Sequence, residues 1–337
     1  MVGPLPLFPR FRRFPLFPRF RRASGLVPSG VALLGVALLG GALAQAVPPR
    51  LNGFALHPSA IPADEIRPGG PPPDGIPALD RPAVVGAGAA LLDADDMVVG
   101  VVVGGEARAY PLAILTWHEL VNDELGGTPL LVSFCPLCGT ALVFDRRLDG
   151  RARRFGVSGL LYQSDLLMFD RETGSLWSQI TARAETGALM GRRLALVRSR
   201  IERWGRWKAS HPSTTVLSRD TGHRRDYDRS PYPGYAESPD LSFPVRRQDP
   251  RYHPKMPVLG LRTADGRARA YPAVELRRAG GRAEERFAGR RVRIRYDLDA
   301  KVFQVEAPAA IEVVEGYWFA WVAFHPETEV FVAPGDP

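Results

Sequence analysis

The stretch Val98–Leu120, VVGVVVGGEARAYPLAILTWHEL, decides the predicted fold, because a second stretch, Pro257–Ala279 (PVLGLRTADGRARAYPAVELRRA), matches it. In both, two predicted strands flank a glycine turn, and the second strand ends at a proline that can open a short helix. Downstream, Gly126–Phe134 pairs with Phe287–Tyr296, and TALVFDR pairs with AKVFQVE. We therefore predict a β-rich α+β fold with two copies of a degenerate β-β-α-β-β module in one compact unit.

The remaining segments give the predicted organisation. Residues 211–235 are dense in Pro, Asp and Tyr, and predict a long polar loop inserted between the two modules; a loop of this length is usually functional or disordered. The predicted boundaries are a leader at 1–46, an extended Pro/Gly-rich arm at 47–82 and a main domain at 83–337. Within that domain we expect the first module at about 98–146, a middle segment at 147–256, the second module at about 257–306 and an aromatic C-terminal segment at 307–337.

The N-terminal segment has the pattern of an export signal. Its first 22 residues carry six arginines and no acid, and an apolar run, Gly25–Leu43, then leads to Ala44-Gln45-Ala46. This order predicts a secretory signal peptide, with an uncleaved membrane anchor as the alternative. Either way we expect an extracytoplasmic protein (periplasmic, secreted or membrane-tethered) that contacts a membrane only through this segment.

The leader also accounts for most of the positive charge. It contributes +6 of the formal net charge of +8, which leaves +2 for the rest of the chain. So small an excess gives no reason to expect a nucleic acid partner.

The only two cysteines lie in Cys135-Pro136-Leu137-Cys138-Gly139, between two predicted strands. A Cys-x-x-Cys turn between strands is typical of a metal knuckle, whereas thioredoxin-like redox pairs lie at a helix N-terminus. Two thiolates do not complete a coordination shell, so a metal site needs two further ligands. The softness of thiolate and imidazole ligands favours one transition metal ion, zinc or copper.

Two histidines are candidates for the missing ligands. His118 is the better one, because the helix predicted from Pro111 places it beside an apolar stripe and leads into the strand that ends at Cys135. The alternative is a core histidine satisfied by a backbone carbonyl group. His211, before a proline at the start of the polar loop, is the weaker candidate, since histidines at helix ends commonly act as caps.

A second group of polar residues interrupts apolar stretches and predicts a pocket. Its members are Ser158, Tyr162, Gln163, Ser164, Asp165, Trp177 and Gln179, with Tyr227 and Asp226 from the polar loop. If the metal site is catalytic, Asp165 and Asp226 are the candidates for proton transfer. No glycine-rich phosphate loop is present, so we expect no nucleotide cofactor.

Five separated motifs carry a family resemblance. They are GGPPPDGIPALDRP, GEARAYPLAILTWHELVND, SFCPLCGTALVFDR, FGVSGLLYQSDLLMFDRETGSLWSQ and HPSTTVLSRDTGHRRDY. Together they resemble an uncharacterised, mainly bacterial domain-of-unknown-function family, number 3179, over roughly residues 54–330. The resemblance implies an exported or membrane-tethered protein with a shared Cys-x-x-Cys signature, and no particular activity, ligand or redox partner.

Three functional hypotheses follow. The first is an extracytoplasmic metal-binding protein, catalytic if a coordination position stays open. The second is a thiol–disulfide protein in which Cys135 attacks and Cys138 resolves. The third is a non-enzymatic ligand-binding or scaffold module in which a Cys135–Cys138 disulfide stiffens a turn.

Overall fold

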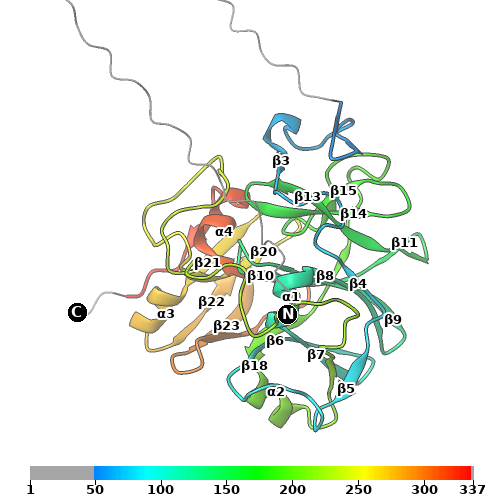
Figure 1. Cartoon of the computed structure of the whole chain (residues 1–337). Helices are drawn as coiled ribbons and strands as arrows, with labels where there is room; N and C mark the ends of the chain where they lie inside the picture. Colours follow the sequence, from blue (N-terminus) through cyan, green and yellow to red (C-terminus); the bar gives the residue numbers. More distant parts are fainter. Residues whose placement is uncertain (1–48, 335–337) are drawn as a thin grey trace, which may run out of the picture. The chain divides into compact units, whose positions relative to one another are not determined.

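The computed structural model describes residues 49–334 and is dominated by strands, with 42% strand and 10% helix. Five sheets of three to five strands form a propeller-like arrangement (Figure 1). The predicted export leader at residues 1–46 lies outside the described residues. Within residues 49–334, none of the helices has the length and apolar character needed to span a bilayer.

Two of the five sheets carry the candidate site. The cysteine sheet has the order β17-β10-β9-β8-β4 and consists of β4 (Leu79–Asp80), β8 (Leu120–Leu125), β9 (Thr128–Cys135), β10 (Thr140–Asp145) and β17 (Ala195–Val197). The aspartate sheet has the order β16-β15-β14-β13-β3 and consists of β3 (Arg67–Pro68), β13 (Phe155–Tyr162), β14 (Asp165–Asp170), β15 (Leu176–Ser178) and β16 (Arg183–Ala184).

The other three sheets complete the propeller-like arrangement. The third has the order β18-β6-β7-β19-β5, from β5 (Val84–Gly86), β6 (Met97–Val103), β7 (Glu106–Pro111), β18 (Ser199–Arg203) and β19 (Thr215–Leu217). The fourth has the order β25-β20-β21-β26, from β20 (Pro257–Arg262), β21 (Ala268–Pro272), β25 (Glu312–Tyr317) and β26 (Glu329–Val330). The fifth is β22 (Arg282–Phe287), β23 (Arg290–Asp297) and β24 (Val302–Glu306).

Short elements complete the fold. The helices are α1 (Leu112–His118), α2 (Trp204–Ser210), α3 (Ala273–Arg278), α4 (Trp318–Phe324) and the 3₁₀ turn η1 (Ala63–Glu65). Two further strand pairs are β1 (Arg50–Leu51) with β2 (Phe54–Ala55), and β11 (Arg147–Leu148) with β12 (Arg151–Ala152). The Pro/Gly-rich segment 47–82 supplies η1 and the edge strands β3 and β4, which pair with β13 and β8.

The prediction of two β-β-α-β-β modules is wrong, although the fold is β-rich as expected. The hairpin β6–β7 belongs to the third sheet, whereas β8, β9 and β10 form the cysteine sheet. In the second stretch, β20 and β21 separate in the same way from β22, β23 and β24. The short helix therefore connects two different sheets, and the strands before and after it are not one unit.

The third and fourth sheets are built in the same way, and each includes strands from outside the predicted modules. In each, a strand from a later segment pairs antiparallel with the first strand of the hairpin, and the strand after a short helix pairs parallel with its second strand. The helices α2 and α4 each place a tryptophan, Trp207 or Trp321, on a glycine of the facing strand. A Cβ atom at Gly100 or Gly260 would overlap the indole ring.

We predict that Gly100→Ala and Gly260→Ala each lower the free energy of unfolding by about 1–3 kcal/mol, because the added methyl group overpacks a buried ring. Chemical denaturation measures the effect. The control is Gly86→Ala, whose Cβ would have no neighbour within 4 Å and which should change stability by less than about 0.5 kcal/mol. Equal effects at the three positions would contradict the packing described here.

Candidate functional site

The Cys-x-x-Cys segment forms the turn between β9 and β10. The Cys138 amide donates a hydrogen bond to the Cys135 carbonyl oxygen at 3.2 Å, and the Tyr317 amide donates to the Cys138 carbonyl oxygen at 2.8 Å. Gly139 follows with φ +61°, and a Cβ atom there would lie 2.9 Å from the Tyr317 ring. The turn is therefore closed on itself and fixed against β25, and only glycine fits after the second cysteine.

A second hairpin tip, between β13 and β14, lies against this turn. Tyr162 pairs with Asp165, and the two turn residues, Gln163 and Ser164, have φ values of 51° and 65°. Positive φ at both positions is typical of a type I′ turn, which glycine and asparagine usually occupy. The Cys138 thiol donates a hydrogen bond to the Ser164 carbonyl oxygen at 3.3 Å, so the two tips are in direct contact.

The side chain of Gln163 holds this tip in place. Its amide nitrogen donates to a Glu65 carboxylate oxygen at 2.6 Å, and its amide oxygen accepts from the Arg246 backbone amide at 2.6 Å. The strained tip is thus fixed between Glu65 of the Pro/Gly-rich segment and the backbone at Arg246. Strain of this kind persists where surrounding contacts determine the backbone.

The two tips bring Cys135, Cys138 and Asp165 together. Their sulfur atoms and one carboxylate oxygen all lie within 4.8 Å of one another, and all three residues are buried. The Asp165 Oδ2 atom accepts a hydrogen bond from the Ile180 amide at 3.2 Å. The Oδ1 atom has no hydrogen-bond partner among residues 49–334, although Asp165 is only 1% exposed. A buried carboxylate oxygen without a partner is rare and costly.

Burial dominates the electrostatics of this cluster. It raises the pKa of Asp165 to about 7, even though the Ile180 amide and the two thiols act in the opposite direction. Burial also raises the pKa of Cys135, and it raises the pKa of Cys138 further, helped by the neighbouring thiol and by Asp165. Without a cation, the cluster therefore favours protonated, neutral groups.

Glu119 is a further buried acidic residue whose charge acts on this cluster, and the sequence analysis did not predict it. It is 7% exposed, and burial, with the charge of Asp165, raises its pKa to about 8. Its charge in turn raises the pKa of Cys135. The signal in the sequence is its position directly after His118, a candidate ligand.

Gln179 joins the two strands behind the turn. Its amide nitrogen donates to the Ser133 hydroxyl at 2.9 Å and to the Thr140 carbonyl oxygen at 3.0 Å. Thr140 pairs with Cys135 in the ladder, so Gln179 lies next to the cysteine turn. Its amide oxygen is buried and has no hydrogen-bond partner within the described chain.

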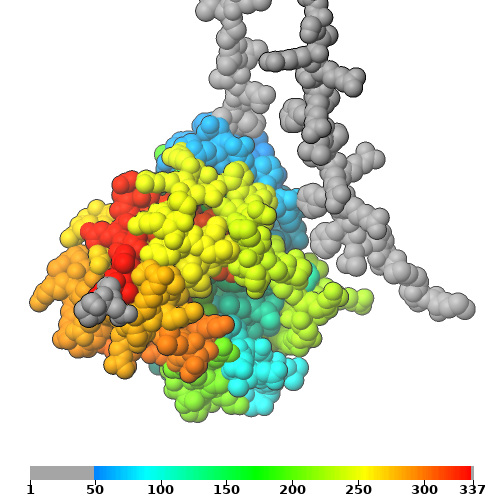
Figure 2. Space-filling model, turned by 90° about the vertical axis from the view of Figure 1, so that its left-hand side faces the viewer, coloured from blue at the N-terminus to red at the C-terminus, as the bar shows by residue number. Residues whose placement is uncertain are grey.

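A segment without helix or strand, residues 218–256, covers the site and is here named the covering loop. Its apolar side chains pack on the core cluster that contains both cysteines; they are Tyr232, Tyr235, Leu241, Phe243, Val245, Tyr252 and Met256. Figure 2 shows much of this loop, in yellow, on one face of the molecule. The cysteines therefore lie beneath it, away from solvent.

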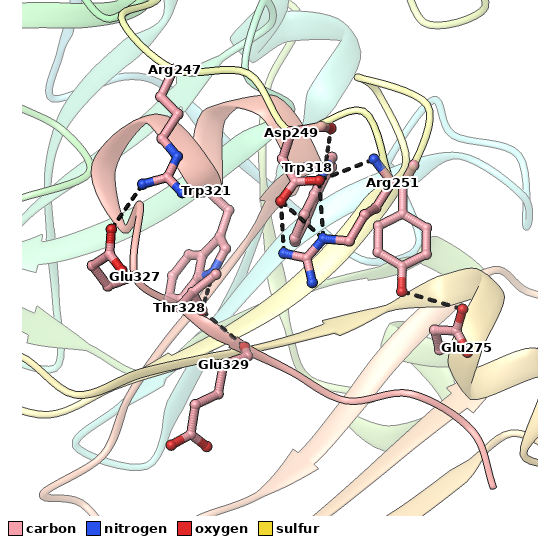
Figure 3. A network of polar contacts seen from close by, with 10 residues as sticks. Arg247, Asp249, Arg251, Glu275, Trp318, Trp321, Glu327, Thr328 and Glu329 are labelled. Atoms are coloured by element: carbon pink, nitrogen blue, oxygen red, sulfur yellow. Dashed lines mark hydrogen bonds and ion pairs between the residues drawn. The ribbon is translucent and has the colours of Figure 1, made fainter.

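The end of the covering loop is fastened to α4 and to the segment that follows α4 (Figure 3). Arg247 pairs with Glu327 at 2.8 Å, and the Trp318 indole N–H donates to the Asp249 carbonyl oxygen at 2.9 Å. Asp249 also pairs with Arg251 at 2.6 Å. Several polar contacts thus hold the loop over the site.

The structure places His118 in a different network. It is 0% exposed, and its two ring nitrogens lie 2.8 Å from the Pro77 carbonyl oxygen and 2.7 Å from the Tyr227 hydroxyl. Because a carbonyl oxygen only accepts, Nδ1 carries the proton and the Tyr227 hydroxyl donates to Nε2. Burial lowers the pKa of His118 to about 4, so the ring is neutral and both nitrogens are engaged. Asp165, instead of His118, is the third group beside the cysteines.

The His118 network borders a separate surface cavity. The Tyr227 hydroxyl lies 2.6 Å from that of Thr221, and Thr221 lines a cavity of about 430 Å³ together with Asp80, Arg81 and His223. Tyr227, predicted as a pocket residue, thus belongs to this network and is not part of the cysteine cluster.

Other predicted site residues have local contacts. The His211 ring packs against the Trp207 ring, with centroids 4.1 Å apart and the ring planes tilted by 43°. Asp226 is exposed, and its carboxylate accepts from the Asp228 amide at 3.2 Å. Ser158 donates to the Leu167 carbonyl oxygen at 2.5 Å.

Two aromatic pocket candidates complete the set. The Trp177 indole N–H donates to Asp170 at 3.0 Å, within the aspartate sheet. The Tyr162 ring lies edge-on to Phe324, with centroids 5.8 Å apart. Of the predicted pocket residues, Gln163, Ser164 and Gln179 are those that border the cysteine cluster.

Comparison with known proteins gives the family. Residues 73–311 match the family described as "Protein of unknown function (DUF3179)", and the chain belongs to this family. No curated protein and no solved structure matches the chain.

We predict that apo protein, kept free of metal by a chelator, loses stability relative to its Asp165→Asn variant as the pH rises from about 4 to about 7. The pKa of Asp165 is about 7 in the folded protein against 3.8 for a free side chain. Between these values the folded state binds more protons than the unfolded state, so its free energy of unfolding falls with rising pH. Asparagine does not titrate.

Denaturant titrations across this pH range measure the difference between the two proteins. The difference in free energy of unfolding should change steadily up to about pH 7 and stay constant above that value. A difference that is independent of pH would mean that Asp165 is not held in a desolvated site.

Proposed function

We propose that this protein is an exported metal-binding protein whose ion is held by Cys135, Cys138 and Asp165. One observation carries the proposal: three groups that become metal ligands on losing a proton lie within 4.8 Å of one another. Moreover, the Asp165 Oδ1 atom is buried and without a hydrogen-bond partner in residues 49–334. A cation at this point would supply that partner.

The charge balance supports the proposal. Asp165 and the two cysteines are buried, and no basic side chain forms an ion pair with Asp165 in the described part of the chain. Burying a charge without a counterion costs several kcal/mol, and groups so placed stay protonated or bind a metal. A transition metal ion would replace these protons, since two thiolates and a carboxylate fit zinc or copper.

The same features disfavour a redox dithiol. A nucleophilic cysteine needs a lowered pKa, which a helix N-terminus or a nearby cation provides. Here burial raises the pKa of both thiols, and the cysteines lie in a turn between strands. The export part of the proposal rests on residues 1–46, with their basic start, apolar run and small-residue site.

We predict that protein purified without chelator contains about one transition metal ion per chain, and that Cys135→Ser and Cys138→Ser reduce this content to near zero. Asp165→Asn should weaken binding by about 10–100-fold, since a neutral amide replaces the carboxylate. Elemental analysis and competition with a metal-binding dye measure both effects. The matched control is Asp226→Asn, an exposed carboxylate that should leave binding unchanged. A wild-type protein without metal, both as purified and after addition of zinc or copper(I), would contradict the proposal.

We further predict that a thiol reagent labels the native protein far more slowly than the unfolded chain. Both cysteines are buried beneath the covering loop, and their raised pKa values leave little thiolate. The rate of colour release from an aromatic disulfide reagent measures this. Labelling of the native protein as fast as that of a free thiol would favour a redox role instead.

A further inference from the structure

We infer that residues 230–248 of the covering loop form a flap that opens to give access to Cys135, Cys138 and Asp165, and that Arg246 is its latch. The inference rests on the proposed function, because it gives the route by which an ion reaches the same centre. The burial of the three proposed ligands, the contacts at the two ends of the flap and the contacts along its length carry it.

The three proposed ligands are shut off from solvent. Cys135, Cys138 and Asp165 are 2%, 0% and 1% exposed. An ion therefore reaches them only after part of the chain has moved. The cysteine turn joins the paired strands β9 and β10, and the second tip joins the paired strands β13 and β14. Local opening starts in segments with few backbone hydrogen bonds, which points to the covering loop and away from these ladders.

The backbone of the flap is not part of the sheets. Within residues 49–334, no hydrogen bond between backbone atoms joins residues 230–248 to a strand or a helix. The backbone bonds that the flap makes are local. The Tyr235 amide donates to the Tyr232 carbonyl oxygen at 3.3 Å, and the Ser238 amide donates to the Gly234 carbonyl oxygen at 3.2 Å. The flap can therefore move without breaking a sheet.

Hydrogen bonds from two tryptophans hold the two ends of the flap. Just before it, the Trp117 indole N–H donates to the Arg229 carbonyl oxygen at 3.2 Å. Just after it, the Trp318 indole N–H donates to the Asp249 carbonyl oxygen at 2.9 Å. The Trp318 amide also donates to the Met256 carbonyl oxygen at 2.9 Å. These contacts define the ends of the segment that moves.

The underside of the flap favours the closed state. Five partly buried side chains pack on the core cluster that contains both cysteines; they are Tyr232, Tyr235, Leu241, Phe243 and Val245. Lys255, which is 3% exposed, donates from its ammonium group to the carbonyl oxygens of Ser238, at 2.7 Å, and of Asp240. The closed flap is therefore the ground state, and the open flap is a minor state.

Arg246 fastens the flap on its exposed side. Its Nε atom donates to the Glu65 carboxylate at 2.9 Å, and its backbone amide donates to the Gln163 side chain at 2.6 Å. Gln163 precedes Ser164, whose carbonyl oxygen accepts from the Cys138 thiol, so the latch acts one residue from the cluster. The Arg246 side chain is 59% exposed, and an ion pair this exposed is weak and screened by salt. A weak latch lets the flap open while the domain stays folded.

The test measures how fast an aromatic disulfide reagent labels the two cysteines of the metal-free protein. The inference predicts that Arg246→Ala is labelled about two- to fivefold faster than wild type, because loss of the ion pair raises the fraction of open flap. The matched control is Arg267→Ala, which removes an arginine that is also 59% exposed and pairs with Asp265 at 2.9 Å. This control should leave the rate unchanged. Equal rates for Arg246→Ala and wild type would overturn the role of the latch.

The dependence of labelling on denaturant separates flap opening from unfolding. Opening of a short flap exposes little surface, so at low denaturant the labelling rate should hardly change with denaturant concentration. A rate that follows the denaturant dependence of global unfolding at every concentration would overturn the flap, since the cysteines would then react only in the unfolded chain.

Zinc exchange, followed with a fluorescent zinc indicator, connects the flap with the ion. Arg246→Ala should gain and lose zinc about two- to fivefold faster than wild type with unchanged affinity, because the flap opens before both steps. Unchanged zinc exchange in a variant that is labelled faster would overturn the flap as the route of the ion. A wild-type chain that binds no zinc or copper(I) would overturn the proposed function, and the labelling rates would still decide whether the flap opens.

Discussion

The central constraint in this structure is the burial of Asp165 against two thiols. A carboxylate that is 1% exposed, with one oxygen lacking any hydrogen-bond partner in the described chain, must stay protonated or bind a cation. The surrounding elements serve to keep it there. The strained tip of β13–β14 is held by Gln163, the cysteine turn is fixed by Tyr317, and the covering loop packs on the core cluster that contains both cysteines. The fold thus maintains an unfavourable arrangement that a metal ion would turn into a favourable one.

The β-rich character was predictable from the sequence, but the sheet pairing was not. The similar sequences of Val98–Leu120 and Pro257–Ala279 indicate similar hairpins and helices, but they do not show which strands share a sheet. The strands that pair with these hairpins come from elsewhere in the chain. In the third and in the fourth sheet, one later strand leads through a short helix into a second strand, and these two strands pair with the two sides of the hairpin. A signal for this exists in WGRWKASHPST (204–214) and WFAWVAFHPET (318–328), where Trp, Trp, His-Pro and Thr recur at the same spacing. Trp207 and Trp321 make equivalent contacts in the two sheets.

The cysteine pair was found from the sequence because two cysteines this close together have few possible roles. Asp165 was noted as a polar residue without a turn role, but its place beside the thiols depends on a contact between two hairpin tips, which no local pattern encodes. His118 was assigned to the centre because of helix periodicity and because its helix leads into the strand that ends at Cys135, whereas its ring nitrogens contact Pro77 and Tyr227. Sequence patterns thus identified the residue types, and long-range contacts decided which of them meet.

Anomalous diffraction at the zinc edge, from crystals of protein purified without chelator, tests the central claim most directly. The account predicts a single strong peak among Cys135, Cys138 and Asp165, at about 2.3 Å from each sulfur and about 2.0–2.2 Å from the carboxylate oxygen. A disulfide bond between the two cysteines, with no peak beside Asp165, would contradict it.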